Sequence, residues 1–217
     1  MNTEALTCFC LSCIVIFIFY PITEHIIGYR FIRLKTFDKY HKDYIVKNII
    51  KSCCLFALCI ASAKYIIPDL RMNIWNTKRI QIFASFYVSN DAVALVRVEK
   101  LPLTTRIHHI ITCLFLVYVW NIDFNTSLVG QKIFVYTVCS AIAAPVNFYL
   151  GMRYLDPKNM EMLRIVCKYL YMSVIIINWT YYALTFNLET DTLIYSCLAF
   201  WLLLDDIILI KWLWRKP

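Results

Sequence analysis

Apolar stretches recur along this chain, and short polar or basic segments separate them. Each stretch is close to the roughly 20 residues that an α-helix needs to cross the hydrocarbon core of a bilayer. Pro145 is expected to kink the fifth stretch, because proline removes a helical hydrogen-bond donor. The pattern predicts an all-α membrane protein, a bundle of about seven transmembrane helices. The predicted spans are residues 5–22, 44–67, 79–97, 106–122, 131–152, 162–186 and 191–211.

The composition agrees with a membrane protein. Of 217 residues, 61% are hydrophobic and 17% are charged, and the mean hydropathy is +0.62. A soluble domain of this length is rarely so apolar. The chain shows no internal repeat, low-complexity tract or flexible linker. We therefore expect a single membrane domain.

The meaning of the net charge of +8 depends on where the basic residues lie along the chain. In a soluble protein it would suggest a nucleic-acid partner, but here the lysines and arginines lie in the segments beside the apolar spans. Such residues set the orientation of a membrane protein, because they accumulate in cytosolic loops. The bias predicts a luminal or external N-terminus and a cytosolic C-terminus, and it argues against nucleic-acid binding.

Asp91 lies inside one predicted span, and His108 and His109 lie at the start of the next. An aspartate at the centre of a membrane helix costs roughly 2.5–3.5 kcal/mol, so such groups usually face a cavity or a partner. Asp91 is expected to orient a histidine, as a carboxylate does in a catalytic triad. Neighbouring helical residues point about 100° apart, so we expect one histidine to act and the other to hydrogen-bond the chain. A structural role for the whole group remains the alternative.

More polar residues fall at a similar depth in other predicted spans. This layer predicts a polar cavity in the cytosolic half of the bundle. The alternative is that these groups pair or extend to the membrane surface, which is the behaviour we expect of Lys47 and Lys51. The residues predicted to line the cavity are Asn147, Arg153, Asp205 and Asp206.

A metal centre is not expected from this pattern. A metal would need further His, Asp or Glu ligands at suitable spacing. His25 and His41 lie in or beside a basic loop and lack that spacing. The sequence therefore predicts neither a metal nor a resident cofactor.

Several of these segments together resemble the TLC (TRAM–LAG1–CLN8) domain family. Residues 85–91 read S-F-Y-V-S-N-D, and Leu101-Pro102 precedes the stretch I-H-H-I-I-T at residues 107–112. The family shows an aromatic-x-x-x-Asp helix followed by H-H-x-x-T. Ala144-Pro145-Val146-Asn147 with Arg153-Tyr154 is similar to the P-x-x-N-x-R-W element of its smaller members, loosened by an insertion.

The resemblance implies a TLC-like architecture: a six-helix core plus an N-terminal helix, in an endoplasmic-reticulum-type membrane, with a cavity for a lipid chain. Residues 1–39 would form the N-terminal transmembrane helix and a basic cytosolic loop, 40–213 the TLC-like multipass domain, and 214–217 a short basic cytosolic tail.

The ceramide synthase branch of the family supplies an enzymatic hypothesis. There the histidine pair is linked to acyl transfer from acyl-CoA to a sphingoid base, which would make His108 and His109 the catalytic residues here. Asp91 would join them as the carboxylate that orients the acting histidine. That branch also carries H-D-x-x-D in the next span, whereas residues 138–144 of this chain contain neither a carboxylate nor a histidine. The resemblance is therefore closer to the small members that are not synthases.

Three functions are compatible with these features. The first is a protein that binds or senses lipid, or regulates membrane lipid composition, through the polar cavity; its partners would be membrane lipids such as fatty acyl chains or sphingolipids. The second is an acyl-CoA-dependent lipid N-acyltransferase that uses His108 or His109, with acyl-CoA as a substrate rather than a cofactor. The third, a receptor or channel with seven spans, has the topology but shows no receptor motif.

Overall fold

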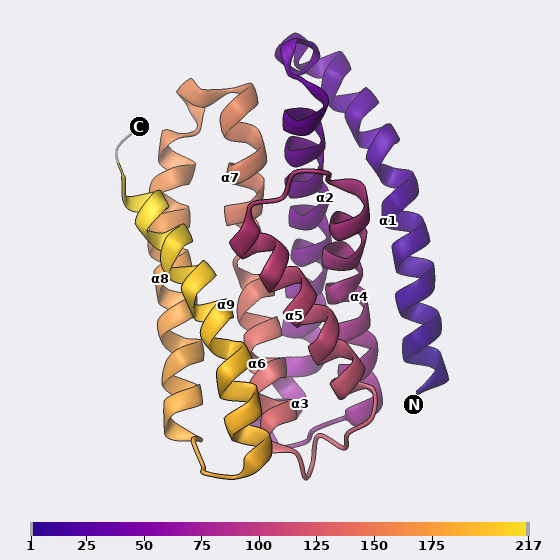
Figure 1. Cartoon of the computed structure of the whole chain (residues 1–217), viewed down its shortest axis with the longest axis vertical. Coiled ribbons are helices and arrows are strands. Elements are labelled where there is room, and N and C mark those ends of the chain that lie inside the picture. The colour runs from indigo at the N-terminus through magenta and orange to yellow at the C-terminus, as the bar shows by residue number, and fades with distance from the viewer. Residues whose placement is uncertain (1, 216–217) are drawn as a thin grey trace.

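The computed structural model describes residues 2–215, and all the regular structure in this part of the chain is helical (Figure 1). The all-α fold class is confirmed. The predicted tail at 214–217 lies partly outside the described residues. The α-helices are α1 (Thr3–Arg30), α2 (Lys39–Ala61), α3 (Ile67–Arg71), α4 (Thr77–Arg97), α5 (Leu103–Val119), α6 (Leu128–Ile142), α7 (Ala144–Leu155), α8 (Glu161–Leu184) and α9 (Thr190–Trp214).

The helix ends follow local chemistry. The first backbone N–H groups of a helix lack partners within the helix, and short polar side chains commonly accept hydrogen bonds from them. Side chains do this at the start of four helices: Asn2 for α1, Asp38 for α2, Asn76 for α4 and Ser127 for α6. A π-helical turn, Ser62–Ile66, joins α2 to α3, so the two continue as one helical stretch.

Among the described residues, four helical stretches are long and apolar enough to cross a membrane. They are Thr3–Arg30, Lys39–Arg71, Glu161–Leu184 and Asp191–Trp214. A fifth span results if α6 and α7 cross together, because they pass the same test as a pair bent by 44°. Pro145 lies in the first turn of α7, directly after the bend, which confirms the kink predicted there. The chain is therefore an integral membrane protein by its helices, with four or five candidate spans.

The predicted count of seven spans is not confirmed, and α4 and α5 account for the difference. The buried face of α4 includes several polar residues, which lower its mean hydropathy. The 17 residues of α5 reach only about 26 Å, less than the ~30 Å hydrocarbon core. Both helices nevertheless lie alongside the long ones in the bundle (Figure 1).

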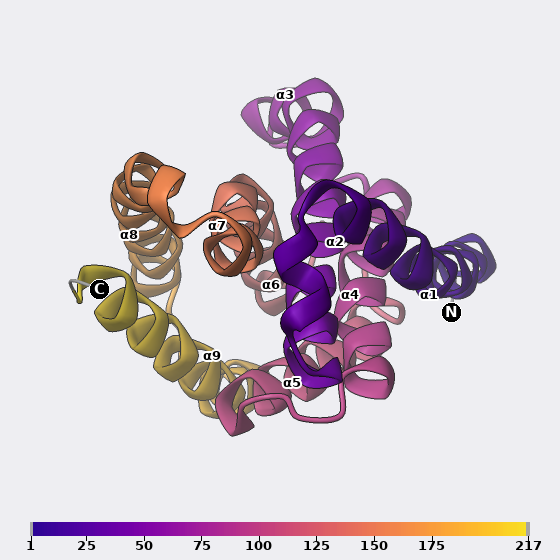
Figure 2. The ribbon, with the colours of Figure 1, turned by 90° about the horizontal axis from the view of Figure 1, so that it is seen from above.

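The helices after α1, apart from the short α3, form a closed ring when the bundle is viewed from above (Figure 2). Around this ring α2 packs against α4, α4 against α5, α5 against α9, α9 against α8, and α8 against α6 and α7. The ring closes where α7 packs against α2. The N-terminal helix α1 lies outside it, against α4 and α2. Helices distant in sequence therefore share one interior.

The closure between α2 and α7 depends on a glycine. A Cβ atom added to Gly151 would lie 2.9 Å from Ile49 Cγ1 and 3.1 Å from the Ile45 backbone oxygen. Small residues commonly let membrane helices approach this closely. One end of the bundle carries the α1–α2 connection, the α4–α5 turn, the α7–α8 connection and the end of α9, and it lies uppermost in Figure 1. We call it the basic end, because its connections are rich in lysine and arginine.

Candidate functional site

A cavity of about 280 Å³ lies inside the ring, toward the basic end. Its wall includes side chains from α2 and from α4 to α9, and none from the described part of α1. Of the residues predicted to line it, Asn147, Arg153 and Asp205 do so, together with both histidines. The fourth, Asp206, lines a smaller adjoining chamber instead. Small-molecule pockets typically measure ~300–1,000 Å³, so this cavity is at the small end of that range.

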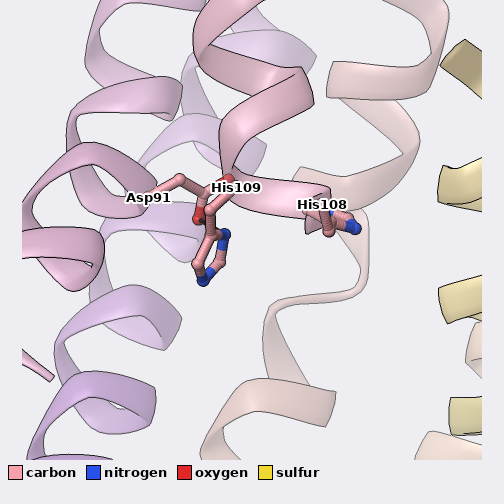
Figure 3. A group of neighbouring side chains, drawn as sticks. All are labelled: Asp91, His108 and His109. Carbon is pink, nitrogen blue, oxygen red and sulfur yellow. Dashed lines mark ion pairs between the residues drawn. The ribbon is translucent and has the colours of Figure 1, made fainter. Parts of the chain in front are cut away.

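Asp91 is fully buried behind the cavity wall, at the centre of a polar network. The Nδ1 atom of His109 is 3.0 Å from Asp91 Oδ1, and the Lys51 ammonium is 2.5 Å from the same oxygen. The Thr112 hydroxyl donates a hydrogen bond of 3.1 Å to Oδ2. The structure therefore brings Asp91 and His109 together, as shown in Figure 3. These contacts join α4 to both α2 and α5.

The structure places two lysines of α2 differently from the expectation. Lys47 and Lys51 were expected to extend to the membrane surface, and that expectation is wrong. The Lys51 side chain is 12% exposed, Lys47 is 7% exposed, and both line the cavity. The turn of α2 that carries them faces the ring interior, where Lys51 meets Asp91. The sequence alone did not show that the two helices are neighbours.

His108 has a different carboxylate partner. Its Nδ1 atom lies 3.2 Å from Asp205 Oδ2, so this pair joins α5 to α9. The rings of His108 and His109 are 86° apart in plane, and His108 points away from Asp91 in Figure 3. Because adjacent residues of a helix diverge, the pair serves two different partners. Both histidines line the cavity, but His109 contacts the buried Asp91, whereas His108 contacts Asp205, which is 19% exposed.

Asp206 belongs to the second, smaller chamber. The Tyr171 hydroxyl donates a 2.8 Å hydrogen bond to its Oδ1 atom. The chamber measures about 20 Å³, room for one water molecule, and shares Tyr136, Ser140 and Tyr171 with the main cavity. Sequence reasoning missed these tyrosines, since a tyrosine inside an apolar run carries no signal that separates a lining residue from a core residue.

The site is poorly suited to a metal ion. Asp91, His108 and His109 offer ligand atoms within 4.8 Å of one another. However, the Lys51 ammonium already occupies one Asp91 oxygen at 2.5 Å. A dication there would be repelled by this ammonium and would have to displace it. The carboxylate charge is instead balanced by the chain's own lysine.

Comparisons of this chain with protein-family models, with curated proteins and with solved structures found no match. The resemblance to the TLC family therefore depends on the motifs around Asp91, His108 and Asn147. The chemistry open to the site follows from its geometry. That geometry consists of a partly open cavity with polar and apolar lining residues and a histidine–carboxylate pair in its wall.

Proposed function

We propose that this chain is a TLC-like multipass membrane protein that binds or senses a lipid in the cavity of the helix ring. The observation that carries the proposal is the mixed polar and apolar lining of a partly open cavity within an apolar bundle. Leu150, Ile208 and Leu209 line it beside Asn147 and Arg153. Such a wall suits an amphiphile, because it offers apolar contacts to a chain and polar contacts to a head group.

In this proposal α4 and α5 also cross the membrane, which gives seven spans in an endoplasmic-reticulum-type membrane. Two features support the additional crossings. The polar residues of α4 are buried against neighbouring helices and so are shielded from lipid. The turn between α4 and α5 carries Lys100 and lies at the basic end. The charge rule then places the basic end in the cytosol and the N-terminus in the lumen.

Orientation is tested by accessibility of single cysteines on a cysteine-reduced background. A cysteine at position 35, in the α1–α2 connection, is expected to react with an impermeant maleimide added from the cytosolic side of sealed vesicles. A cysteine at position 125, between α5 and α6, is expected to react only after the vesicles are opened. The reverse labelling pattern would refute this orientation.

Lipid binding is tested by identifying what co-purifies with the protein. Extraction in a mild detergent, followed by mass spectrometry, is expected to find one lipid class enriched over the bulk extract. Asn147→Trp places a large ring in the cavity and is expected to remove most of that enrichment, because it fills the space that the lipid needs. Asn125→Trp, at an exposed position, is the matched control. If the lipid that co-purifies with the wild type and with both variants has the composition of the bulk extract, the cavity does not bind a specific lipid.

A second candidate function, acyl transfer, is favoured by one observation. Residues 138–144 lack the carboxylates of the synthase motif, but Asp205 contacts His108 from α9. A carboxylate beside one ring nitrogen fixes the tautomer and leaves the other nitrogen basic. His108 would accept a proton from an attacking amine, while the thioester C–S bond of acyl-CoA breaks and an amide bond forms. Acyl-CoA would be the substrate, and free thiol and amide would be the products.

A further inference from the structure

The charges in the cavity wall are not balanced. Lys47, Lys51 and Arg153 line the cavity, and Asp205 is the carboxylate among the described lining residues. Lys51 is paired with Asp91 behind the wall, and Asp205 lies against His108. Within residues 2–215, no carboxylate lies within 4.0 Å of Lys47 or Arg153. Two positive charges therefore face the cavity without a counter-charge.

Lys47 is the more demanding of the two, because it is more than nine-tenths buried. Its ammonium lies 5.1 Å from the centre of the Tyr44 ring, a contact that offsets little of the lost hydration. An unpaired buried charge is strongly unfavourable unless a partner neutralises it. The position of Lys47 in the wall makes a partner from within the cavity the natural one.

Arg153 is held in place by aromatic rings. Its guanidinium lies 4.0 Å from the Trp212 ring and 4.7 Å from the Tyr154 ring, and Nη2 donates to the Tyr154 hydroxyl at 2.9 Å. The Nη1 atom is buried and has no hydrogen-bond partner among the described residues. A stacked, planar guanidinium with unused donors is well suited to phosphate oxygens.

The two cations belong to one region of the wall. The Tyr44 and Tyr154 rings are 5.9 Å apart, and each contacts one of the two cations. These contacts connect the start of α2 with the end of α7, where the ring of helices closes. One anionic group in this part of the cavity would face the side of the wall that carries both cations.

We propose that the cavity binds the head group of a lipid phosphate monoester, with Lys47 and Arg153 as its counter-charges. This inference rests on the proposed lipid-binding function and names the lipid class. A phosphate monoester carries about −1.5 to −2 charge at pH 7, which matches two cations, whereas a carboxylate would leave one unmatched. The cavity of about 280 Å³ holds the head group and the first carbons of the chain, so the rest of the chain extends between helices toward the membrane.

The test compares four probes by the thermal stabilisation they give the purified full chain in detergent. The probes are 1-oleoyl-glycerol 3-phosphate, oleate, mono-oleoylglycerol and inorganic phosphate. The phosphate lipid is expected to bind at least tenfold more tightly than the other three. Equal binding of the neutral lipid or of oleate would overturn the inference, and so would inorganic phosphate binding as tightly as the lipid.

Variants of one helical stretch supply matched controls. Lys47→Met is expected to weaken binding of the phosphate lipid at least tenfold and to leave mono-oleoylglycerol binding unchanged. Lys47→Arg keeps the charge and should retain most of the affinity. Lys64→Met removes an exposed lysine that also lies over a tyrosine ring, and should change neither. Equal phosphate-lipid affinity in Lys47→Met and Lys64→Met would refute the role of Lys47.

Folding is a separate readout in the same experiment. Because Lys47→Met removes an unpaired buried charge, the melting temperature of the lipid-free variant is expected to equal or exceed that of the wild type. A lower melting temperature would show that Lys47 has a structural partner and would contradict the inference. Failure of every lipid to bind the wild type would refute the proposed function as well, whereas equal binding of neutral and phosphate lipids refutes only this step.

Discussion

Replacing Asp91 with leucine is expected to lower the free energy of unfolding by about 3–5 kcal/mol, the usual range when one partner of a buried ion pair is removed. The substitution leaves the Lys51 ammonium without its carboxylate and His109 and Thr112 without their shared acceptor. Asp91→Asn is expected to cost less, because an amide oxygen still accepts from Thr112. Unfolding in mixed detergent micelles with increasing dodecyl sulfate measures these differences.

A double-mutant cycle separates the ion pair from general disruption. Lys51→Met alone leaves the Asp91 carboxylate with His109 and Thr112 but without its cation, and is also expected to be strongly destabilising. The double variant Asp91→Leu/Lys51→Met contains neither charge, so it should recover much of the combined loss. Asp191→Leu, at an exposed position, is the control and should stay within about 0.5 kcal/mol of wild type. Strict additivity of the two single losses would show that the pair is not coupled.

Substitutions of the two histidines are expected to have different effects on any acyl-transfer activity. If the chain is an enzyme, His108→Asn should lower the initial rate of transfer from acyl-CoA to a sphingoid amine at least ~100-fold, because general base catalysis typically contributes 10²–10⁴. The folded state should survive this change, because His108 is paired with the partly exposed Asp205 rather than with the buried Asp91. His109→Asn is expected to act chiefly on stability, since its ring meets Asp91.

Asp205 provides the accompanying control for this activity. Asp205→Asn removes the orienting charge but keeps a hydrogen-bonding group beside His108, so it should reduce the rate less than loss of the imidazole does. Melting temperatures of all variants are measured alongside the rates. The enzymatic function is excluded if the wild type shows no turnover with any sphingoid or glycerolipid acceptor while every protein retains lipid. The binding function would then remain. Loss of turnover in His109→Asn with unchanged stability would instead assign catalysis to His109.

The helices themselves were largely predictable from the chain. The apolar runs located the long helices, and Pro145 located the bend between α6 and α7. A charge at membrane depth carries a high free-energy cost, which led to the prediction that Asp91 contacts a histidine. The structure places Asp91 against His109. These inferences succeed because each depends on a property that is local in sequence or on a rule about single buried charges.

The arrangement around the cavity was not predictable, because it depends on which helices are neighbours. Lys51 and Asp91 are 40 residues apart and come from α2 and α4. Asp205 reaches His108 because α9 packs against α5, an adjacency that no pattern in either helix specifies. The difference between His108 and His109 also depends on the direction of α5 in the ring. Hydropathy counts the buried polar face of α4 as a reason against a span, although that face is turned inward.

The pairing of Lys51 with Asp91 also has a consequence for biosynthesis. If α4 crosses the membrane, its carboxylate enters the bilayer after α2 has already been synthesised, and alone it would be costly to insert. The Lys51 ammonium, 40 residues earlier in the chain, lowers this insertion free energy only while α2 remains beside α4. We therefore expect α1, α2 and α4, which pack against one another, to leave the insertion machinery as a group, with the remaining helices joining them afterwards.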